Sequence, residues 1–180
     1  MANREAIREL QARLASRLQA AKDEGLSVSW LAIKSGGRSY LLPLAQSGEI
    51  FPISSMQPVP YARPWFRGVV NLRGGLYGVV DLATFVSGDA AAPGPLARSV
   101  PEAVVVTLNA ALNVNCALLV DTLAGMRHAE GFVSARGPSA DAPPYFGNCF
   151  TDAGGESWQE INLQTLAQFP RFLNITASVT

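Results

Sequence analysis

The feature that most constrains the fold is a series of short strand-like segments, which begins near residue 27 and continues almost to the end of the chain. Each segment is rich in Val, Ile, Leu or aromatic residues and is flanked by turn residues, as β-strands are. The predicted strands are 28–33, 39–44, 49–53, 66–72, 76–80, 103–108, 114–120 and 158–163. Short strands at close spacing are typical of a barrel or a sandwich, and the long helices that a βαβ fold needs are absent.

Loop and helix signals interrupt this series. Residues 54–64 contain three prolines and predict an extended loop, and residues 136–144 predict another. Residues 87–101 are rich in Ala, Gly and Pro, and are interpreted as a connection between two halves of the fold. Residues 163–173 have the apolar spacing of a short C-terminal helix, which Pro170 is expected to end or kink.

The N-terminal residues 4–24 read as one amphipathic helix, because their apolar residues recur at helical spacing and Gly25 follows as a natural terminator. The apolar stripe consists of Ile7, Leu10, Leu14, Leu18 and Ala21. Two alternatives are open for this stripe: it docks on the domain behind it, or on a helix of a partner. The chain is accordingly divided into a helix at 1–25 and a folded domain at 27–180.

The composition excludes several classes of protein. Fourteen basic residues balance fourteen acidic ones, so the basic excess of a nucleic-acid-binding or membrane-binding protein is missing. A β-barrel that binds single-stranded nucleic acid needs aromatic side chains along a basic groove. Residues 65–67 and Arg73 alone are weak evidence for such a groove. Two cysteines make no disulfide framework, and neither a secretory signal nor an apolar span of membrane length is present. The expected location is the cytoplasm.

A short internal echo marks the ends of three strands. The run GVVNL at 68–72 returns as GVVDL at 78–82, and LLVD at 118–121 is a weaker third copy. Asp and Asn side chains accept hydrogen bonds from backbone N–H groups where a strand gives way to a helix or turn. Asp81 and Asp121 are therefore predicted to be the N-caps of two short helices. These helices are expected at 82–86 and 122–126.

Candidates for catalysis are few. Asp81 and Asp121 are alternatives as paired carboxylates for acid–base chemistry, but their places at strand ends favour capping. His128, the single histidine, and Cys149 form a conceivable nucleophilic pair that no local motif supports. These residues show no metal-ligand spacing, and the glycine-rich stretch after Arg73 lacks the P-loop pattern. The sequence therefore predicts no catalytic, metal-binding or cofactor-binding residue.

A longer motif covers the first two copies of the echo. The run FRGVVNLRG at 66–74 is followed by VVDL at 79–82, and this arrangement resembles the CheW family of chemotaxis coupling proteins. That family typically has G-V-[IV]-N-L-R-G, a few residues, and then P-V-[IV]-D-L. Weaker matches extend the resemblance from about Trp30 to Leu173. They are Glu49-Ile50, Pro58-Val59-Pro60, 117–123 with Gly125, Phe146-Gly147 and 152–155.

The resemblance implies a mainly β fold of two small five-stranded SH3-like β-barrels packed through a shared hydrophobic core. It implies an adaptor that links the cytoplasmic tip of a methyl-accepting chemoreceptor to a CheA-type histidine kinase, with no catalysis, no cofactor and no direct membrane insertion. Such an adaptor is recruited to membrane-associated receptor arrays. The N-terminal extension, Gly78 in place of the usual Pro and Ser47 in place of the usual Val suggest the PilI branch of type IV pilus (twitching) systems. An adaptor of flagellar chemotaxis is the alternative.

Partner-binding roles are carried over from the motif onto Glu49, Ile50, Asn71, Arg73 and Gly74. Arg73 follows a strand and precedes two glycines, so its side chain is expected to project from a turn. There it makes either a polar contact to a receptor helix or a salt bridge within the domain. Asn71 is expected to fix the turn, and Gly74 to permit a backbone conformation that a Cβ would strain.

Overall fold

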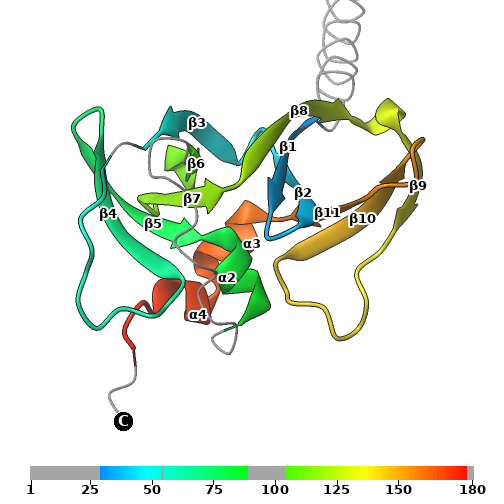
Figure 1. The fold of residues 1–180 in the computed structure, drawn as a ribbon. Coiled ribbons are helices and arrows are strands. Elements are labelled where there is room, and N and C mark those ends of the chain that lie inside the picture. Colours follow the sequence, from blue (N-terminus) through cyan, green and yellow to red (C-terminus); the bar gives the residue numbers. More distant parts are fainter. Residues whose placement is uncertain (1–28, 54, 89–103, 178–180) are drawn as a thin grey trace, which may run out of the picture.

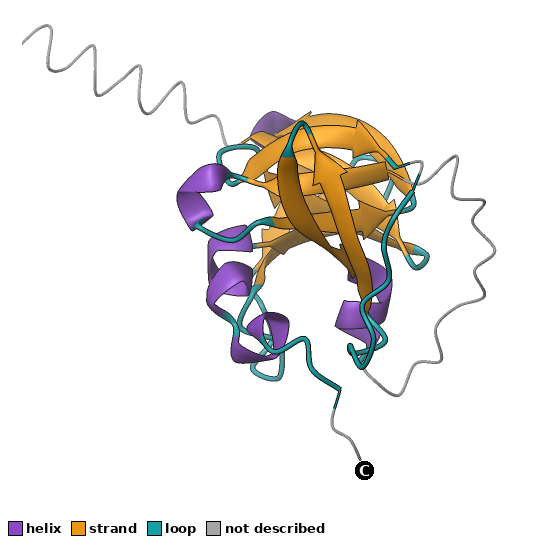
Figure 2. Ribbon diagram, turned by 90° about the vertical axis from the view of Figure 1, so that its left-hand side faces the viewer, coloured by secondary structure: helices purple, strands orange, loops and turns teal. Residues whose placement is uncertain are grey.

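The computed structural model describes residues 29–53, 55–88 and 104–177 (Figure 1). The predicted N-terminal helix at 4–24 and most of the predicted connection at 87–101 lie outside these residues. Within them the fold is mainly β, and Figure 2 shows short helices at the periphery of the strands. No helix among the described residues has the length and apolar character that crossing a membrane requires.

The strands form two sheets, one of six strands and one of five. In sheet order, the first contains β8 (Thr122–His128), β1 (Ser29–Ser35), β2 (Arg38–Pro43), β11 (Ser157–Ile161), β10 (Phe146–Asp152) and β9 (Phe132–Arg136). The second contains β3 (Ser47–Pro52), β6 (Val104–Leu108), β7 (Cys116–Val120), β5 (Gly75–Asp81) and β4 (Phe66–Leu72). The expectation of five strands in each half is therefore wrong for the first sheet.

The chain crosses between the sheets twice. It leaves the first sheet after β2, builds the whole second sheet from β3 to β7, and returns to the first sheet at β8, which pairs with β1. The second sheet is thus an insertion in the first. The first sheet cannot be completed before the chain has passed through the second, because β1 and β8 are separated by all five strands of the second sheet.

Several strands are buried on both faces, and successive side chains along them enter two different hydrophobic clusters in turn. In β1, Leu31 and Ile33 enter a large central cluster between the sheets, while Trp30 and Ala32 enter a smaller cluster within the first sheet. In β7, alternate residues likewise divide between the central cluster and a small cluster within the second sheet. Such strands read as continuous apolar runs, which is why the sequence predicted them correctly.

The second sheet curls until its two edges meet. β3 and β4 are at opposite ends of the strand order, yet Gln57, five residues after β3, pairs with Val69 of β4. The N–H of each residue donates to the carbonyl oxygen of the other, at 2.9 Å from Gln57 and 2.8 Å from Val69. The interior of this curl is filled by the small cluster that includes Ile53, Val70 and Val79.

The helices cover one end of the central core. They are α2 (Leu82–Ser87), α3 (Leu163–Gln168) and α4 (Pro170–Leu173), which lie close together in Figure 1. Trp65, Phe85 and Phe172 are buried among them, with ring centroids 5.0 Å apart for Trp65 and Phe85 and 6.5 Å apart for Trp65 and Phe172. Pro170 begins α4, so the predicted break in the C-terminal helix is confirmed.

The two predicted N-caps have different outcomes. Asp81 caps α2, with its carboxylate accepting from the N–H of Thr84 at 3.2 Å, an interaction typically worth about 1 kcal/mol. The prediction for Asp121 was wrong, because the next residues form β8 rather than a helix. Pairing of β8 with β1 outweighs the local capping signal, and the Asp121 carboxylate instead accepts from the N–H of Gly36 at 3.1 Å.

The hairpin between β10 and β11 depends on a carboxylate. Asp152 accepts hydrogen bonds from the buried Trp158 indole N–H at 3.0 Å and from the N–H groups of Glu156 and Gly154 at 3.0 Å and 2.9 Å. These donors, the Trp158 indole first among them, hold the pKa of Asp152 below its ordinary value of 3.8. The sequence pattern does not predict β9 and β10, because their residues are half-buried or exposed and form no apolar run.

Asp152→Asn is expected to lower the melting temperature at neutral pH. The substitution replaces the charged carboxylate, which accepts three hydrogen bonds, with a neutral amide that accepts them more weakly. A lowered folded-state pKa contributes stability above the unfolded-state pKa, and this contribution is lost as the pH falls through the folded-state value. The difference in melting temperature between the parent protein and the variant should therefore shrink below about pH 3.8. Asp141→Asn, in an exposed turn, is the matched control. A difference that is independent of pH would contradict this role.

Candidate functional site

The predicted partner-binding residues come together at one end of the second sheet. Glu49 and Ile50 lie on β3, Asn71 lies on β4, and Arg73 and Gly74 form the turn between β4 and β5. Because the sheet curls, the guanidinium of Arg73 reaches the carboxylate of Glu49 on the opposite edge strand, with an N–O distance of 2.6 Å. The salt bridge within the domain, one of the two alternatives for Arg73, is therefore present.

The turn that carries Arg73 is fixed by its own residues. Arg73 and Gly74 have φ angles of 50° and 84°, as in the hairpin turns that match the twist of antiparallel strands. The side-chain oxygen of Asn71 accepts from the N–H of Gly74 at 3.0 Å, which is the turn-fixing bond expected of this residue. Positive φ is costly for Arg but easy for Gly, so Gly74 has the permissive role predicted for it.

Glu49 is positioned by a β-bulge in β3. The register with β6 shifts between Ser47 and Ile50, and the hydroxyl of Thr107 fills the irregularity. It accepts from the N–H of Glu49 at 2.8 Å and donates to the carbonyl oxygen of Glu49 at 3.2 Å. A Cβ on Gly48 would clash with this hydroxyl. The bulge thus holds the Glu49 backbone in place while its side chain points to solvent.

The ion pair remains open to solvent. The side chains of Arg73 and Glu49 are 74% and 58% exposed, and the Arg73 guanidinium also lies 5.4 Å from the ring centroid of Phe51. Exposed ion pairs contribute about 0–1 kcal/mol to stability, so the fold depends little on this one. Most of the donor and acceptor surface of both side chains stays available to a second molecule.

Apolar side chains are exposed where the central core ends. Met126 pairs with Leu31, and Leu123 pairs with Ile33, so both point to the same side of the first sheet as these core residues. Ile50 of β3 pairs in the same way with the core residue Val106. We call the three residues Ile50, Leu123 and Met126 the apolar margin. They are 43%, 41% and 64% exposed.

Two residues of the apolar margin were missed by the sequence reasoning. Leu123 and Met126 lie within the helix that was predicted after Asp121. That prediction did not indicate which side of the fold their side chains would face. The signal against that helix was Gly125, because glycine is a poor residue for a helix interior. It has a φ of 89° at an irregularity in the pairing of β8 with β1.

Both departures from the family motif have local explanations. The N–H of Gly78 donates to the carbonyl oxygen of Asn115 at 3.0 Å, a bond that proline cannot make. A Cβ at this position would also lie 2.9 Å from the ring of Phe66. Ser47 is buried, and its hydroxyl donates to the carbonyl oxygen of Pro43 at 2.9 Å. Neither departure touches the ion pair of Arg73.

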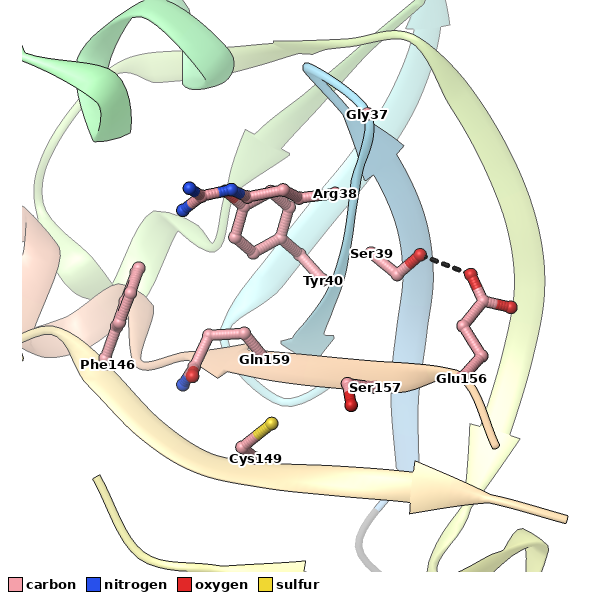
Figure 3. Close-up of a pocket in the computed structure, with 9 residues that line it drawn as sticks. All are labelled: Gly37, Arg38, Ser39, Tyr40, Phe146, Cys149, Glu156, Ser157 and Gln159. Carbon is pink, nitrogen blue, oxygen red and sulfur yellow. Dashed lines mark hydrogen bonds between the residues drawn. The ribbon is translucent and has the colours of Figure 1, made fainter. Parts of the chain in front are cut away.

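The candidate catalytic residues are dispersed. Cys149 lines a cavity of about 370 Å³ between β2, β10 and β11, together with Tyr40 and Gln159 (Figure 3). His128 is elsewhere and shares a hydrogen bond with the Ser29 hydroxyl at 2.8 Å. Glu156, the carboxylate among the residues that line this cavity, accepts from the Ser39 hydroxyl at 2.6 Å. The described residues hold no group of three or more His, Cys, Asp or Glu that could bind a metal.

Comparisons with known proteins agree with this geometry. The family model described as the CheW-like domain matches residues 29–170. The chain is 28% identical to Protein PilI of Pseudomonas aeruginosa over 166 residues, which cover 91% of this chain and 88% of that protein. Its fold is similar to the crystal structure of the scaffolding protein TtCheW from Thermoanaerobacter tengcongensis, with a TM-score of 0.58, 15% identity, and coverage of 74% and 87% of the two chains. The chain therefore belongs to the CheW-like domain family, whose members are scaffold proteins and not enzymes.

Proposed function

We propose that this protein is the adaptor of a chemosensory pathway that controls type IV pilus twitching motility. In this role it joins the cytoplasmic tip of a chemoreceptor to a CheA-type histidine kinase. Family membership supports the adaptor role, and the similarity to a PilI protein along nearly the whole chain favours the pilus branch over flagellar chemotaxis. The protein then acts in the cytoplasm, where its partners recruit it to receptor arrays at the membrane.

The observation that carries the receptor contact is the apolar margin. Ile50 belongs to the second sheet, whereas Leu123 and Met126 belong to the first, and all three project from the sheet faces that form the central core. An amphipathic helix binds through apolar anchors along one of its faces, and these exposed side chains are the proposed counterpart of such anchors. The tip of a chemoreceptor is helical, so one of its helices is the proposed occupant.

Arg73 and Glu49 form the polar rim of the same contact. Glu49 directly precedes Ile50 in β3, but neighbouring side chains of a strand point to opposite faces, so the ion pair lies at the edge of β3 on the side of Phe51. A partner that reaches around this edge strand contacts both the ion pair and Ile50. Arginine presents five donors in a rigid fork, which suits polar residues that flank the apolar face of a helix. The kinase contact is proposed on the hairpin of β4 and β5, where the 61% exposed Leu76 pairs with Asn71.

A deletion of the gene tests the output of the pathway. The deletion is expected to reduce the spreading zone of twitching cells, since the adaptor is the link between receptor and kinase. Flagellar swimming, measured in the same strain, should be unchanged. Loss of swimming with normal twitching would instead support the flagellar alternative.

Arg73→Glu is expected to leave the fold intact and to weaken binding of a receptor fragment about tenfold, since it reverses the charge at the rim of the contact. The double variant Glu49→Arg, Arg73→Glu restores an ion pair of the same geometry with exchanged ends. Pull-down and titration calorimetry with the receptor fragment compare the three proteins. If Arg73 touches the receptor, the exchange does not restore affinity. Full recovery in the double variant would show that only the ion pair matters.

Met126→Asp is expected to reduce affinity for the receptor fragment by about tenfold or more, because it places a charge among the apolar anchors. Val133→Asp is the matched control, since Val133 is 68% exposed on β9 and outside the apolar margin. Melting temperatures establish that both variants fold. Equal loss of binding in the two variants, or none in either, would count against the apolar margin as the receptor contact.

A further inference from the structure

Four strands of the first sheet align one side chain each into a row. Tyr40 of β2 pairs with Gln159 of β11, Gln159 pairs with Cys149 of β10, and Cys149 pairs with Arg136 of β9. Residues directly opposite each other on paired strands project to the same face of a sheet. Tyr40 is buried in the central cluster, Gln159 and Cys149 are half-buried, and Arg136 is exposed. The row therefore leads along one face of the sheet from the core to solvent.

This row lines a continuous groove. One hollow, of about 370 Å³, is lined by Tyr40 and Arg38 among others (Figure 3), and a second, of about 550 Å³, is lined by Arg136 and the loop between β9 and β10. The two hollows adjoin, because both are lined by the same three side chains, those of Phe146, Cys149 and Gln159. We call the two joined hollows the cross-strand groove.

The dimensions of the groove fit an extended peptide. Neighbouring strands are about 4.8 Å apart, so the row from Tyr40 to Arg136 spans at most about 14 Å. An extended chain advances about 3.3 Å per residue, and its side chains alternate between two sides. A segment of about five residues therefore covers the row and directs its first, third and fifth side chains into the groove.

The charges at the two ends of the groove favour an acidic occupant. Arg38 lines only the first hollow and Arg136 only the second, and neither forms an ion pair with another residue that the structure describes. The guanidinium of Arg38 hydrogen-bonds the side chain of Tyr40, which holds it at that end of the row. The carboxylate of Glu156, which also lines the first hollow, is paired with the Lys34 ammonium at 2.8 Å. Each end thus presents a guanidinium whose charge no described carboxylate balances.

The middle of the groove is apolar. Phe146, which lines both hollows, packs against the central cluster and is half-buried, with its ring centroid 5.4 Å from that of Tyr145. Cys149 lies in the same middle part, and a free thiol behaves as a small apolar group. An apolar side chain of a partner that covers Phe146 and Cys149 removes apolar surface from water, which favours binding.

We infer that the cross-strand groove binds an extended acidic segment of a partner protein, in which two acidic residues flank an apolar one at alternate positions. The acidic side chains pair with Arg38 and Arg136 in the bidentate geometry that arginine and carboxylate adopt, and the apolar side chain covers Phe146 and Cys149. The groove shares no residue with the apolar margin or with the hairpin of β4 and β5. It is therefore a third contact of the adaptor, separate from the receptor and kinase contacts proposed above.

An array of random seven-residue peptides, incubated with the full-length protein, tests the specificity of the groove. Peptides with an acidic, any, apolar, any, acidic pattern should be enriched among those that bind, and the variant Arg38→Glu, Arg136→Glu should bind them at least about tenfold more weakly. Arg67→Glu, the same change on β4, is the matched control and should bind like the parent protein. Arg136→Glu alone, at an exposed position, keeps the test valid if loss of the contact between Arg38 and Tyr40 lowers the melting temperature. Absence of this pattern, or equal binding by the parent protein and both groove variants, would overturn the inference.

The thiol of Cys149 reports whether a selected peptide occupies the groove. Cys116 is buried, and burial raises the pKa of its thiol to about 12, so iodoacetamide reacts with Cys149 in the folded protein. A selected peptide should slow this alkylation, and a peptide of the same composition in scrambled order should not. Binding without protection would place the peptide elsewhere and contradict the inference. Equal protection by citrate at the same concentration would also contradict it, because a small anion would then be the occupant.

The receptor fragment separates the groove from the proposed function. The variant Arg38→Glu, Arg136→Glu should bind the fragment as the parent protein does, because both arginines lie outside the apolar margin. Loss of receptor affinity in this variant, with an unchanged melting temperature, would make the groove part of the receptor contact and overturn the inference of a third one. If Met126→Asp binds the receptor normally while the selected peptides still protect Cys149, the groove stands and the proposed receptor contact fails.

Discussion

The structure depends on packing two curved sheets against each other through strands that are buried on both faces. Ile33 of β1 and Leu118 of β7 fill the central cluster, while their neighbours along each strand fill the small cluster inside their own sheet. A strand of this kind cannot shift its register by one residue without exchanging the two cores. The sheets are therefore locked in register by side chains of different sizes on each face, such as Trp30 and Leu31 on β1.

This constraint explains which parts of the fold the sequence could reveal. Strands buried on both faces appear as apolar runs, and each of the eight predicted strands has a counterpart in the structure. The strands that were missed, β8, β9 and β10, carry exposed or half-buried residues in most positions. For β8 the local signals were misleading. Asp121 has the sequence context of an N-cap, but the residues after it pair with β1, more than 85 residues earlier in the chain. Pairing over such a distance has no local trace in the chain.

In the candidate site, too, contacts made within a turn could be predicted from the sequence, and contacts made by long-range strand pairing could not. The motif identified Arg73 and Glu49 separately, and their contact follows from the curl of the second sheet, which brings opposite edges together. The role of Asn71 was predictable because its bond to Gly74 is made within the turn. The apolar margin was not predictable, because whether Met126 faces a core or solvent depends on its register with Leu31, and that register is set by the whole assembly of the first sheet.

The topology also explains why the exposed apolar residues occur on β3 and β8. These are the first strands that the chain forms after each of its two crossings between the sheets, and both lie at the edge of their sheet. An edge strand has a neighbouring strand on one side only, so fewer side chains are available to cover its own. A single molecule that covers them touches both sheets at once. An occupant of both edges contacts the two sheets together, so its affinity depends on how the two sheets are placed relative to each other.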